Sequence, residues 1–354
     1  MSSLQRLSRN LLNRQPADTK IFSLPLLSPI GVAIALLVLL LIFISNLAFG
    51  AANIPLEEVT RAFFANEDST EHLIIRTVRF PRSLIAAFVG AALAVSGAIM
   101  QGITRNPLAS PSILGVNAGA SFAVVVVTFL FQGGDLSLYV WFAFLGAAAT
   151  AVTVYVLGSL GSGGLTAINL TVAGAALTAF LSSLTSGILI VSQQTLDQIR
   201  FWLAGSLAGR DLEVFWQVLP YLSVGLLLAF ALGRQLTMLS LGEEVAKGLG
   251  QQTVLVKILA AVSVVLLAGS SVAIAGPIGF IGLVIPHITR VLIGVDYRWL
   301  LPYAAIFGSI LLLCADLSGR LLFQPQEIPV GLVMPLIGAP FFIHLVQSQM
   351  KQKS

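Results

Sequence analysis

The sequence predicts an all-α, polytopic membrane protein with about ten transmembrane helices. Of its 354 residues, 57% are hydrophobic and only 10% are charged, whereas a soluble domain usually carries about a quarter charged residues. The mean hydropathy of the chain is +0.95. Apolar runs of roughly twenty residues favour helices, because a helix pairs the backbone polar groups within its own segment. The 32 glycines are typical of transmembrane helices that pack closely.

The apolar runs divide the chain into ten segments between two polar tails. We expect the helices at residues 28–48, 83–103, 112–131, 138–158, 168–191, 214–233, 254–275, 278–293, 299–315 and 328–347. The eighth segment is short enough to be partly re-entrant. Residues 1–27 and 349–354 form the tails, and the ten-helix domain covers residues 28–348. The first apolar run is too long for the core of a signal peptide, so we expect it to be retained.

The distribution of lysine and arginine indicates which side of the membrane each loop faces. Ten helices place both tails on one side, and the positive-inside rule assigns that side to the cytoplasm. The cytoplasmic side would carry Arg6, Arg9, Arg14, Lys20, Arg105, Arg234, Lys247, Lys257, Arg290, Arg298, Lys351 and Lys353. The outer side would carry Arg61, Arg76, Arg79, Arg82, Arg200, Arg210 and Arg320. The bias is modest because several arginines cluster on the outer side.

The sequence excludes several classes of active site. The single cysteine, Cys314, cannot form a disulfide within the chain, and the three histidines are far apart in sequence. Neither a phosphate-binding loop nor a catalytic constellation is present, so we predict no catalytic residue, metal site or cofactor in this chain. Charges inside the predicted segments are almost absent, although ion-coupled carriers usually keep one. Asp316 is the nearest candidate, and an ion pair with Arg320, four residues on, is its simplest interpretation.

The charged loop between the sixth and seventh segments contains the sequence LGEEVAKGLG, Leu241–Gly250. Glycines bound it, and two glutamates stand near its start, which predicts a short helix. Leu241, Val245 and Leu249 share one face of that helix. The helix is either a docking element for a soluble partner or a solvated helix that rests on the bilayer surface.

The fifth predicted helix carries a polar stripe. Gly174, Thr178, Ser182 and Ser186 recur every fourth residue, and Gln193 continues near the same face. The stripe either lines a hydrated, uncharged pathway or packs against a neighbouring helix. The loop before it is rich in glycine and uncharged, which suits a moving constriction or an ordinary linker equally.

Two apolar runs of the chain are similar to each other. Gly90–Ile99 aligns without gaps to Gly269–Ile278, and the predicted topology makes the two runs cross the membrane in opposite senses. The similarity indicates either an inverted repeat, which is common in transporters, or chance likeness between two helices of small residues.

Five motifs occur in a fixed order along nearly the whole chain. They are RFPR, GAALAVSGAIMQGITRNPLASPSILGVNAGA, LGEEVAKGLG, AIAGPIGFIGLVIPHITR and EIPVGLVMPLIGAPFFIHLV. Together they resemble the permease subunits of ABC importers for iron-siderophores, haem and cobalamin, the FecCD-type permeases of type II importers. The resemblance implies ten helices per subunit and a dimer of permease subunits. It also implies two cytoplasmic ATPase subunits, which bind ATP and magnesium, and an extracytoplasmic substrate-binding protein.

The resemblance also implies roles for the residues that match the family's motifs. For docking of the binding protein these are Arg79 and Arg82 of RFPR and Arg320 of ADLSGR, with Arg76 as an addition. For docking of the ATPase they are Leu241, Gly242, Glu243, Glu244, Ala246, Gly248, Leu249 and Gly250, in the loop at about 236–253. For the translocation path and its cytoplasmic gate they are Gly161, Ser162, Gly163, Thr166, Asn169, Thr178, Ser182, Ser186 and Gln193.

An iron-siderophore permease in the plasma membrane of a bacterium, with both termini in the cytoplasm, is the function that the resemblance implies. Cobalamin and haem are alternatives within the family, because a small, polar and neutral path does not distinguish these ligands. An ion-coupled secondary transporter is the alternative of another class, and it would need an intramembrane charge that the sequence lacks. A membrane-embedded enzyme has no catalytic constellation to support it. We expect a lipid bilayer around the chain and no nucleic-acid partner.

Overall fold

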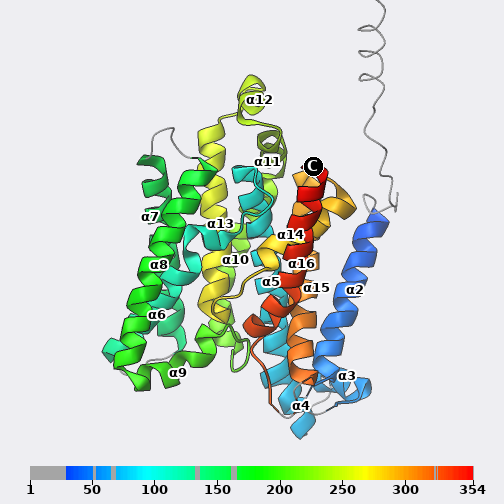
Figure 1. Ribbon diagram of the computed structural model, residues 1–354. Coiled ribbons are helices and arrows are strands. Elements are labelled where there is room, and N and C mark those ends of the chain that lie inside the picture. Colours follow the sequence, from blue (N-terminus) through cyan, green and yellow to red (C-terminus); the bar gives the residue numbers. More distant parts are fainter. Residues whose placement is uncertain are drawn as a thin grey trace, which may run out of the picture.

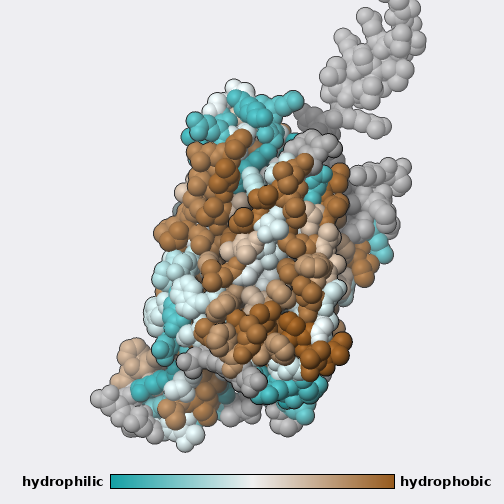
Figure 2. Space-filling view, turned by 90° about the vertical axis from the view of Figure 1, so that its left-hand side faces the viewer, coloured by the Kyte–Doolittle hydropathy of each residue, from teal (hydrophilic) through white to brown (hydrophobic). Residues whose placement is uncertain are grey.

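The computed structural model describes residues 29–50, 53–64, 69–131, 136–160, 166–322, 324 and 326–353. All regular structure within these ranges is helical, and the long helices run side by side between two ends of the molecule (Figure 1). Helix α12 (Glu243–Gly248) marks one end, called the α12 end. Helices α3 (Leu56–Phe64), α4 (Thr70–Ile74) and α9 (Gln193–Leu203) mark the opposite end, called the α9 end. Figure 2 shows an apolar band between more hydrophilic ends, as expected for a protein in a bilayer.

In the described part of the chain, ten apolar helices cover the positions that the sequence predicts. Seven are long enough to cross a membrane: α2 (Pro29–Ala48), α5 (Phe80–Thr104), α7 (Leu136–Leu160), α8 (Ala167–Val191), α10 (Leu212–Ala231), α13 (Thr253–Ala275) and α15 (Tyr297–Leu321). Three have shorter apolar stretches: α6 (Val116–Phe131), α14 (Ile281–Ile293) and α16 (Val330–Lys353). The prediction of an all-α, polytopic membrane protein is therefore confirmed. Helix α14, the eighth segment, is the shortest of the ten, as expected.

The largest difference from the predicted boundaries lies before α5. We expected a helix from residue 83, preceded by a basic knot of Arg76, Arg79 and Arg82 outside it, but helical structure begins at Thr70. It continues through α4 and a π-helical turn, η2 (Ile75–Arg79), directly into α5. The arginines of the expected knot are therefore helical residues. A helix can carry them here because their guanidinium groups find partners inside the protein, so that none has to face lipid.

Helix α5 forms the centre of the bundle and packs against α13, α14 and α15. In its apolar stretch, 83% of the residues are buried. A methyl group on Gly90 would overlap the backbone of Gly308 in α15, and one on Gly97 would overlap the backbone of Gly282 in α14. Two backbones can approach this closely only where neither residue has a side chain. The interpretation of these small residues as tight packing inside one subunit is confirmed.

Helix α8 lies at the periphery, beside α6 and α7 (Figure 1). Only 11% of its apolar stretch is buried. It rests on the 3-10 turn η3 (Pro111–Leu114) through Gly174, where a methyl group would overlap the carbonyl oxygen of Ile113. The remaining surface of α8 is mostly exposed, although the helix is as apolar as its neighbours.

The two runs that align in sequence end differently. Gly90–Ile99 lies wholly inside α5, whereas Gly269–Ile278 leaves α13 after Ala275. Gly276 then has a φ of 73°, a left-handed conformation that glycine adopts without strain. The inverted repeat stays a hypothesis.

Candidate functional site

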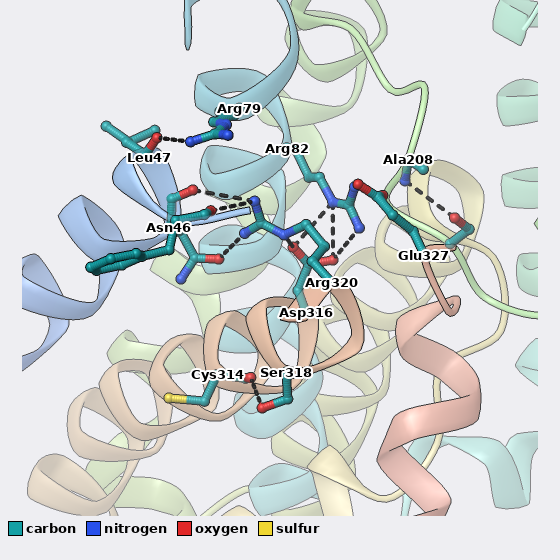
Figure 3. A network of polar contacts seen from close by, with 12 residues as sticks. Asn46, Leu47, Arg79, Arg82, Ala208, Cys314, Asp316, Ser318, Arg320 and Glu327 are labelled. Carbon is teal, nitrogen blue, oxygen red and sulfur yellow. Dashed lines mark hydrogen bonds and ion pairs between the residues drawn. The ribbon is translucent and has the colours of Figure 1, made fainter. Parts of the chain in front are cut away.

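An arginine network lies at the α9 end, where α5 and α15 meet the end of α2 (Figure 3). It consists of Arg79, Arg82, Asp316, Arg320 and Glu327. Arg82 donates from Nε and Nη2 to the Asp316 carboxylate at 2.9 to 3.1 Å, and from Nη1 to Glu327 at 2.5 Å. Arg320 approaches the same carboxylate, with its Nε 3.2 Å from Oδ2 of Asp316. One buried carboxylate therefore bridges two arginines that come from different helices.

The network also stabilises the C-terminal end of α2. Arg79 donates to the carbonyl oxygens of Leu47 and Ala48 at 2.7 and 2.8 Å. Arg320 donates from Nη2 to the side-chain oxygen of Asn46 at 2.5 Å. The last carbonyl groups of a helix have no partner within that helix and carry a partial negative charge. The two guanidinium groups satisfy this end and join α2 to α5 and α15.

The predicted docking arginines lie inside the protein. Arg79, Arg82 and Arg320 are only 5%, 6% and 3% exposed. Arg76, the fourth predicted residue, is partly buried and donates from Nε to the carbonyl oxygen of Ala62 in α3. The structure brings Arg79, Arg82 and Arg320 together, but each has partners in its own chain. Their docking role stays a prediction.

Local spacing could predict only part of the network. The expected ion pair between Asp316 and Arg320 is confirmed. Arg82 lies 234 residues before Asp316 in the chain, and no spacing rule connects them. Glu327 comes from the segment before α16 and is the accessible carboxylate, with its side chain 38% exposed against 1% for Asp316. A partner that approaches the network from outside would therefore meet Glu327 first.

Helix α12 projects from the opposite end of the molecule (Figure 1). Its flanking glycines, Gly242 and Gly250, have φ values of 132° and 79°, which other residues rarely adopt. The predicted short helix between glycines is confirmed. Leu241, Val245 and Leu249 are all exposed and are called the α12 triad. The expectation that they share one face of the helix is met only in part, because Leu241 precedes the non-helical Gly242, Leu249 follows the last residue of α12, and Val245 alone lies within the helix. An exposed apolar surface among polar residues is typical of a site for a protein partner.

Glu243 fastens α12 to α13. Its carboxylate oxygens lie 2.6 Å from Nζ of Lys257 and 3.1 Å from Nζ of Lys247. Hydrogen bonds from Lys257 and then Lys247 lower the pKa of Glu243 to about 2. Glu243 therefore anchors the helix from within the chain. Of the other predicted docking residues, Ala246 is buried, Gly242 is half-buried, and Glu244, Gly248 and Gly250 are exposed.

The predicted path residues of α8 divide into two groups. Thr178 is half-buried and lies beside the turn at Gly115. Ser182 and Ser186 are exposed, as is Gln193. The polar stripe therefore packs against other residues of the chain at Gly174 and Thr178, and its side chains are exposed from Ser182 onward. The end of α8 at Val191 agrees with the predicted segment 168–191, but the sequence did not predict that Gln193 begins the separate helix α9.

The predicted gate precedes α8. Thr166 caps the start of the helix, because its side chain accepts a hydrogen bond of 3.1 Å from the backbone N–H of Asn169. Gly161, Ser162 and Gly163 lie outside the described residues. The structure therefore places the end of the predicted gate at a defined helix start.

The described residues offer surfaces and helices rather than a reactive centre. Among them, no group of three or more histidine, cysteine, aspartate or glutamate side chains could hold a metal ion. His72 instead forms a hydrogen bond with Glu58 of α3, and the ring of His287 packs against that of Phe341. The features that bear on function are therefore the helix bundle, its two ends and the exposed face of α8.

The model of the FecCD transport family matches residues 34–348. The chain belongs to this family. It is 48% identical over 310 residues to the Bacillus subtilis (strain 168) protein named "Probable siderophore transport system permease protein YfiZ", covering 88% of this chain and 93% of that relative. It is 42% identical over 319 residues to the ferric enterobactin transport system permease protein FepD of Escherichia coli (strain K12), covering 90% and 95% of the two chains.

A solved structure also resembles this FecCD-family chain. That structure is described as an inward-facing conformation of a metal-chelate type ABC transporter. The two share a TM-score of 0.80 and 31% sequence identity over 90% of this chain and 99% of that one. The chain is therefore a membrane-spanning permease of the ABC transporter type, and the alternative of an ion-coupled secondary transporter is not favoured.

Proposed function

We propose that this FecCD-family permease passes an iron-siderophore complex from an extracytoplasmic binding protein to the cytoplasm, driven by ATP hydrolysis in partner subunits. The observation that carries the proposal is the identity of 48% and 42%, over nearly the full length, to relatives named for siderophore and ferric enterobactin transport. The hemin transport system permease protein HmuU of Yersinia pestis is 39% identical over 326 residues. Haem is therefore the second candidate ligand.

The α12 end would lie in the cytoplasm of a bacterial cell, with both termini, and the α9 end outside. The distribution of charge supports this orientation. Three of the seven arginines assigned to the outer side, Arg79, Arg82 and Arg320, are bonded inside the protein. These three arginines do not meet lipid headgroups and can be left out of the outer count. The excess of lysine and arginine on the α12 side is then larger than the excess counted from the sequence.

The α12 triad would be the docking surface for a cytoplasmic ATPase subunit. Three exposed apolar side chains, one on α12 and one on each side of it, suit a hydrophobic groove in a partner. The ion pair of Glu243 with Lys257 fixes α12 against α13, so a force applied to α12 is passed into the bundle. ATP and magnesium would be bound by two such partner subunits, one for each permease subunit.

The α9 end would receive the binding protein at the arginine network. Arg82 shares its guanidinium between the buried Asp316 and the accessible Glu327. A carboxylate of the binding protein could therefore replace Glu327 while Asp316 keeps Arg82 in place, since a guanidinium suits bidentate pairing with a carboxylate. Glu327 lies three residues before α16, so this exchange would pull on the start of that helix.

The open face of α8 would line the translocation path together with a second permease subunit, identical or different. Ser182 and Ser186 supply hydroxyl groups without charge, which suits a bulky polar ligand that passes without strong binding. Only 11% of the apolar stretch of α8 is buried, so most of its surface is free to pack against a second subunit. The gate would be the loop that ends at Thr166 and Asn169, with Gly161, Ser162 and Gly163 in it.

Reconstitution tests this function. The chain would be placed in proteoliposomes with candidate ATPase and binding proteins, and radioactive iron uptake and ATP hydrolysis would be measured. We expect uptake of a ferric siderophore only with ATP and a loaded binding protein. The matched variants are Leu249→Asp in the α12 triad, which should abolish stimulation, and Val295→Asp in the exposed loop between α14 and α15, which should not. Uptake by the chain alone in an ion gradient would sink the proposal.

A further inference from the structure

A groove of about 350 Å³ lies between α7 and α13. The two helices are in contact near Gly269, where a methyl group would lie 3.3 Å from the ring of Phe144. From there toward the α12 end they enclose the groove, whose floor includes Met100 of α5. Its walls are almost entirely apolar, and the polar side chains that line it are Thr104, Tyr155 and Lys257. This space is separate from the path proposed along α8.

The groove has the length and the opening of a site for one acyl chain. On α7 it extends from Phe144 to Tyr155, which corresponds to roughly 16 Å along a helix. That is about half of the hydrocarbon core, or one leaflet of the bilayer. Val152, Ile258 and Val262 line it and are themselves exposed, so the groove opens toward the surrounding lipid. An apolar space of this kind does not hold water and fills with hydrocarbon.

Two ammonium groups stand at the α12 end of the groove. Lys257 lines the groove itself, and Lys247 lines a hollow of about 490 Å³ that shares Ile258 with it. Both lysines pair with the single carboxylate of Glu243. One positive charge of this cluster is therefore not neutralised by Glu243.

The hollow provides further groups for a phosphate. Gln251 and Gln252 line it. It also meets the first turn of α13, where Gln252 forms no side-chain cap for the helix. The free N–H groups of a first turn and the helix dipole favour an anion. An apolar slot and a polar, positively charged hollow thus lie end to end.

We propose that the groove and the hollow together bind one anionic phospholipid from the leaflet at the α12 end. One acyl chain lies between α7 and α13, and the phosphate lies beside Lys247 and Lys257. The lipid contacts the same lysines that hold Glu243, so an occupied site ties α12 to the membrane. Neither the lipid binding nor this tie rests on the proposed docking of an ATPase at α12.

Native mass spectrometry of the purified full chain in detergent tests the site, with phosphatidylglycerol and phosphatidylcholine as probes. We expect one phosphatidylglycerol per chain, bound about tenfold more tightly than phosphatidylcholine, because the lysines attract a net negative headgroup, whereas the choline of phosphatidylcholine neutralises its phosphate. Ala261→Phe fills the groove and should weaken both lipids about tenfold, since several methylene groups lose their contacts. Lys247→Gln should weaken phosphatidylglycerol alone, by about fivefold.

Matched controls separate this site from general lipid adhesion. Val156→Phe changes an exposed residue of α7 that does not line the groove, and Arg234→Gln removes an exposed charge from α11 (Gly233–Ser240). Both should bind lipid as the wild type does. Ala148→Phe is a second groove-filling variant and replaces Ala261→Phe if that protein does not fold.

Three results would overturn the proposal. They are unchanged lipid binding in the folded groove-filled variant, equal affinity of the wild type for the two lipids, and displacement of phosphatidylglycerol by inorganic phosphate at millimolar concentration. The last result would indicate an anion site without an acyl chain. The assay contains no ATPase, so its failure leaves the proposed function intact, and a failure of ATPase docking leaves lipid binding intact.

Discussion

Helices α5 and α8 have the same length of 25 residues and similar apolar character, yet their surroundings are opposite. The apolar stretches have mean hydropathies of 2.1 and 1.8, but 83% of the first is buried and only 11% of the second. Hydropathy therefore predicts that a helix crosses the membrane and does not predict what surrounds it. Helix α5 already has its partners within one chain, whereas α8 presents a surface that this chain does not cover.

Small residues have different uses in the two helices. In α5, Gly90 and Gly97 lie against the backbones of α15 and α14, so that packing depends on a missing side chain. In α8, Gly187 has no atom within 4 Å of the position that a Cβ would take. Replacing a glycine by a larger residue should therefore disrupt the packing of α5, whereas the same replacement at Gly187 of α8 should leave the fold intact. The predictions below use this difference, from the largest expected effect to the smallest.

The largest effect is expected for Asp316→Asn, which removes the carboxylate that holds Arg82 of α5 and Arg320. The buried Arg320 would lose its ion-pair partner and Arg82 would keep only Glu327, which costs about 3–5 kcal/mol. The control is Asp197→Asn near α8, whose exposed pair with Arg200 spans 3.8 Å and contributes less than about 0.5 kcal/mol. Thermal unfolding in detergent measures both. Equal stability of the two variants would contradict a structural role for the network.

The second prediction places the same substitution in both helices. Gly97→Ala in α5 should destabilise the fold by about 3 kcal/mol, because the new methyl group overlaps the backbone of Gly282. Gly187→Ala in α8 should stabilise its helix by about 0.5–1 kcal/mol, since alanine loses less backbone entropy. The midpoint of thermal unfolding reports the difference. Opposite shifts would mean that α8, not α5, is the close-packed helix of the subunit.

The third prediction concerns transport rather than stability. Ser182→Leu with Ser186→Leu should lower siderophore uptake about tenfold, because bulky apolar groups would obstruct an uncharged path. The unfolding midpoint should not change, since both side chains are exposed. Thr153→Leu on the exposed face of α7 is the matched loss of a hydroxyl group and should transport normally. Normal uptake by the double variant would show that this face of α8 does not line the translocation path.

The smallest effect on stability is expected at α12, because the ion pairs of Glu243 are partly exposed to solvent. The folded-state pKa of Glu243 is lowered to about 2 from an ordinary value of 4.5. The stabilisation is therefore fully present above about pH 4.5 and is lost as the pH falls through about 2. Solvent screening keeps it below about 1 kcal/mol. Hydrogen exchange of the α12 amides should show this loss in the wild type and not in Glu243→Gln. Similar pH profiles would show that Glu243 does not anchor α12.

The sequence alone predicted features that depend on neighbouring residues. The positions of the ten apolar helices, the short helix between Gly242 and Gly250, and the ion pair of Asp316 with Arg320 all follow from periodicity or close spacing. The contact of Arg82 with Asp316 could not be predicted in this way, because it joins residues 234 positions apart. It also explains why the helical structure extends back beyond residue 83.

The division of the polar stripe on α8 was likewise beyond sequence reasoning. Gly174 and Ser186 belong to the same stripe of residues that recur every fourth position. Gly174 packs on η3, yet Ser186 is exposed. Which part of a stripe is covered depends on where α8 crosses its neighbours, and crossing points are set by tertiary packing. The groove beneath α12 has the same origin, since it exists only where α7 and α13 diverge.

Cysteine labelling of the assembled transporter would distinguish a path-lining α8 from a lipid-facing one most directly. In a Cys314→Ser background, single cysteines would replace Ser186 of α8, Ala92 of α5 and Val156 of α7. A charged methanethiosulfonate reagent reacts with thiols that water reaches. We predict that only the cysteine at position 186 is modified, and that a loaded binding protein with ATP changes its rate. An unreactive cysteine at position 186, equal to that at position 156, would show that α8 faces lipid and would contradict the proposed path.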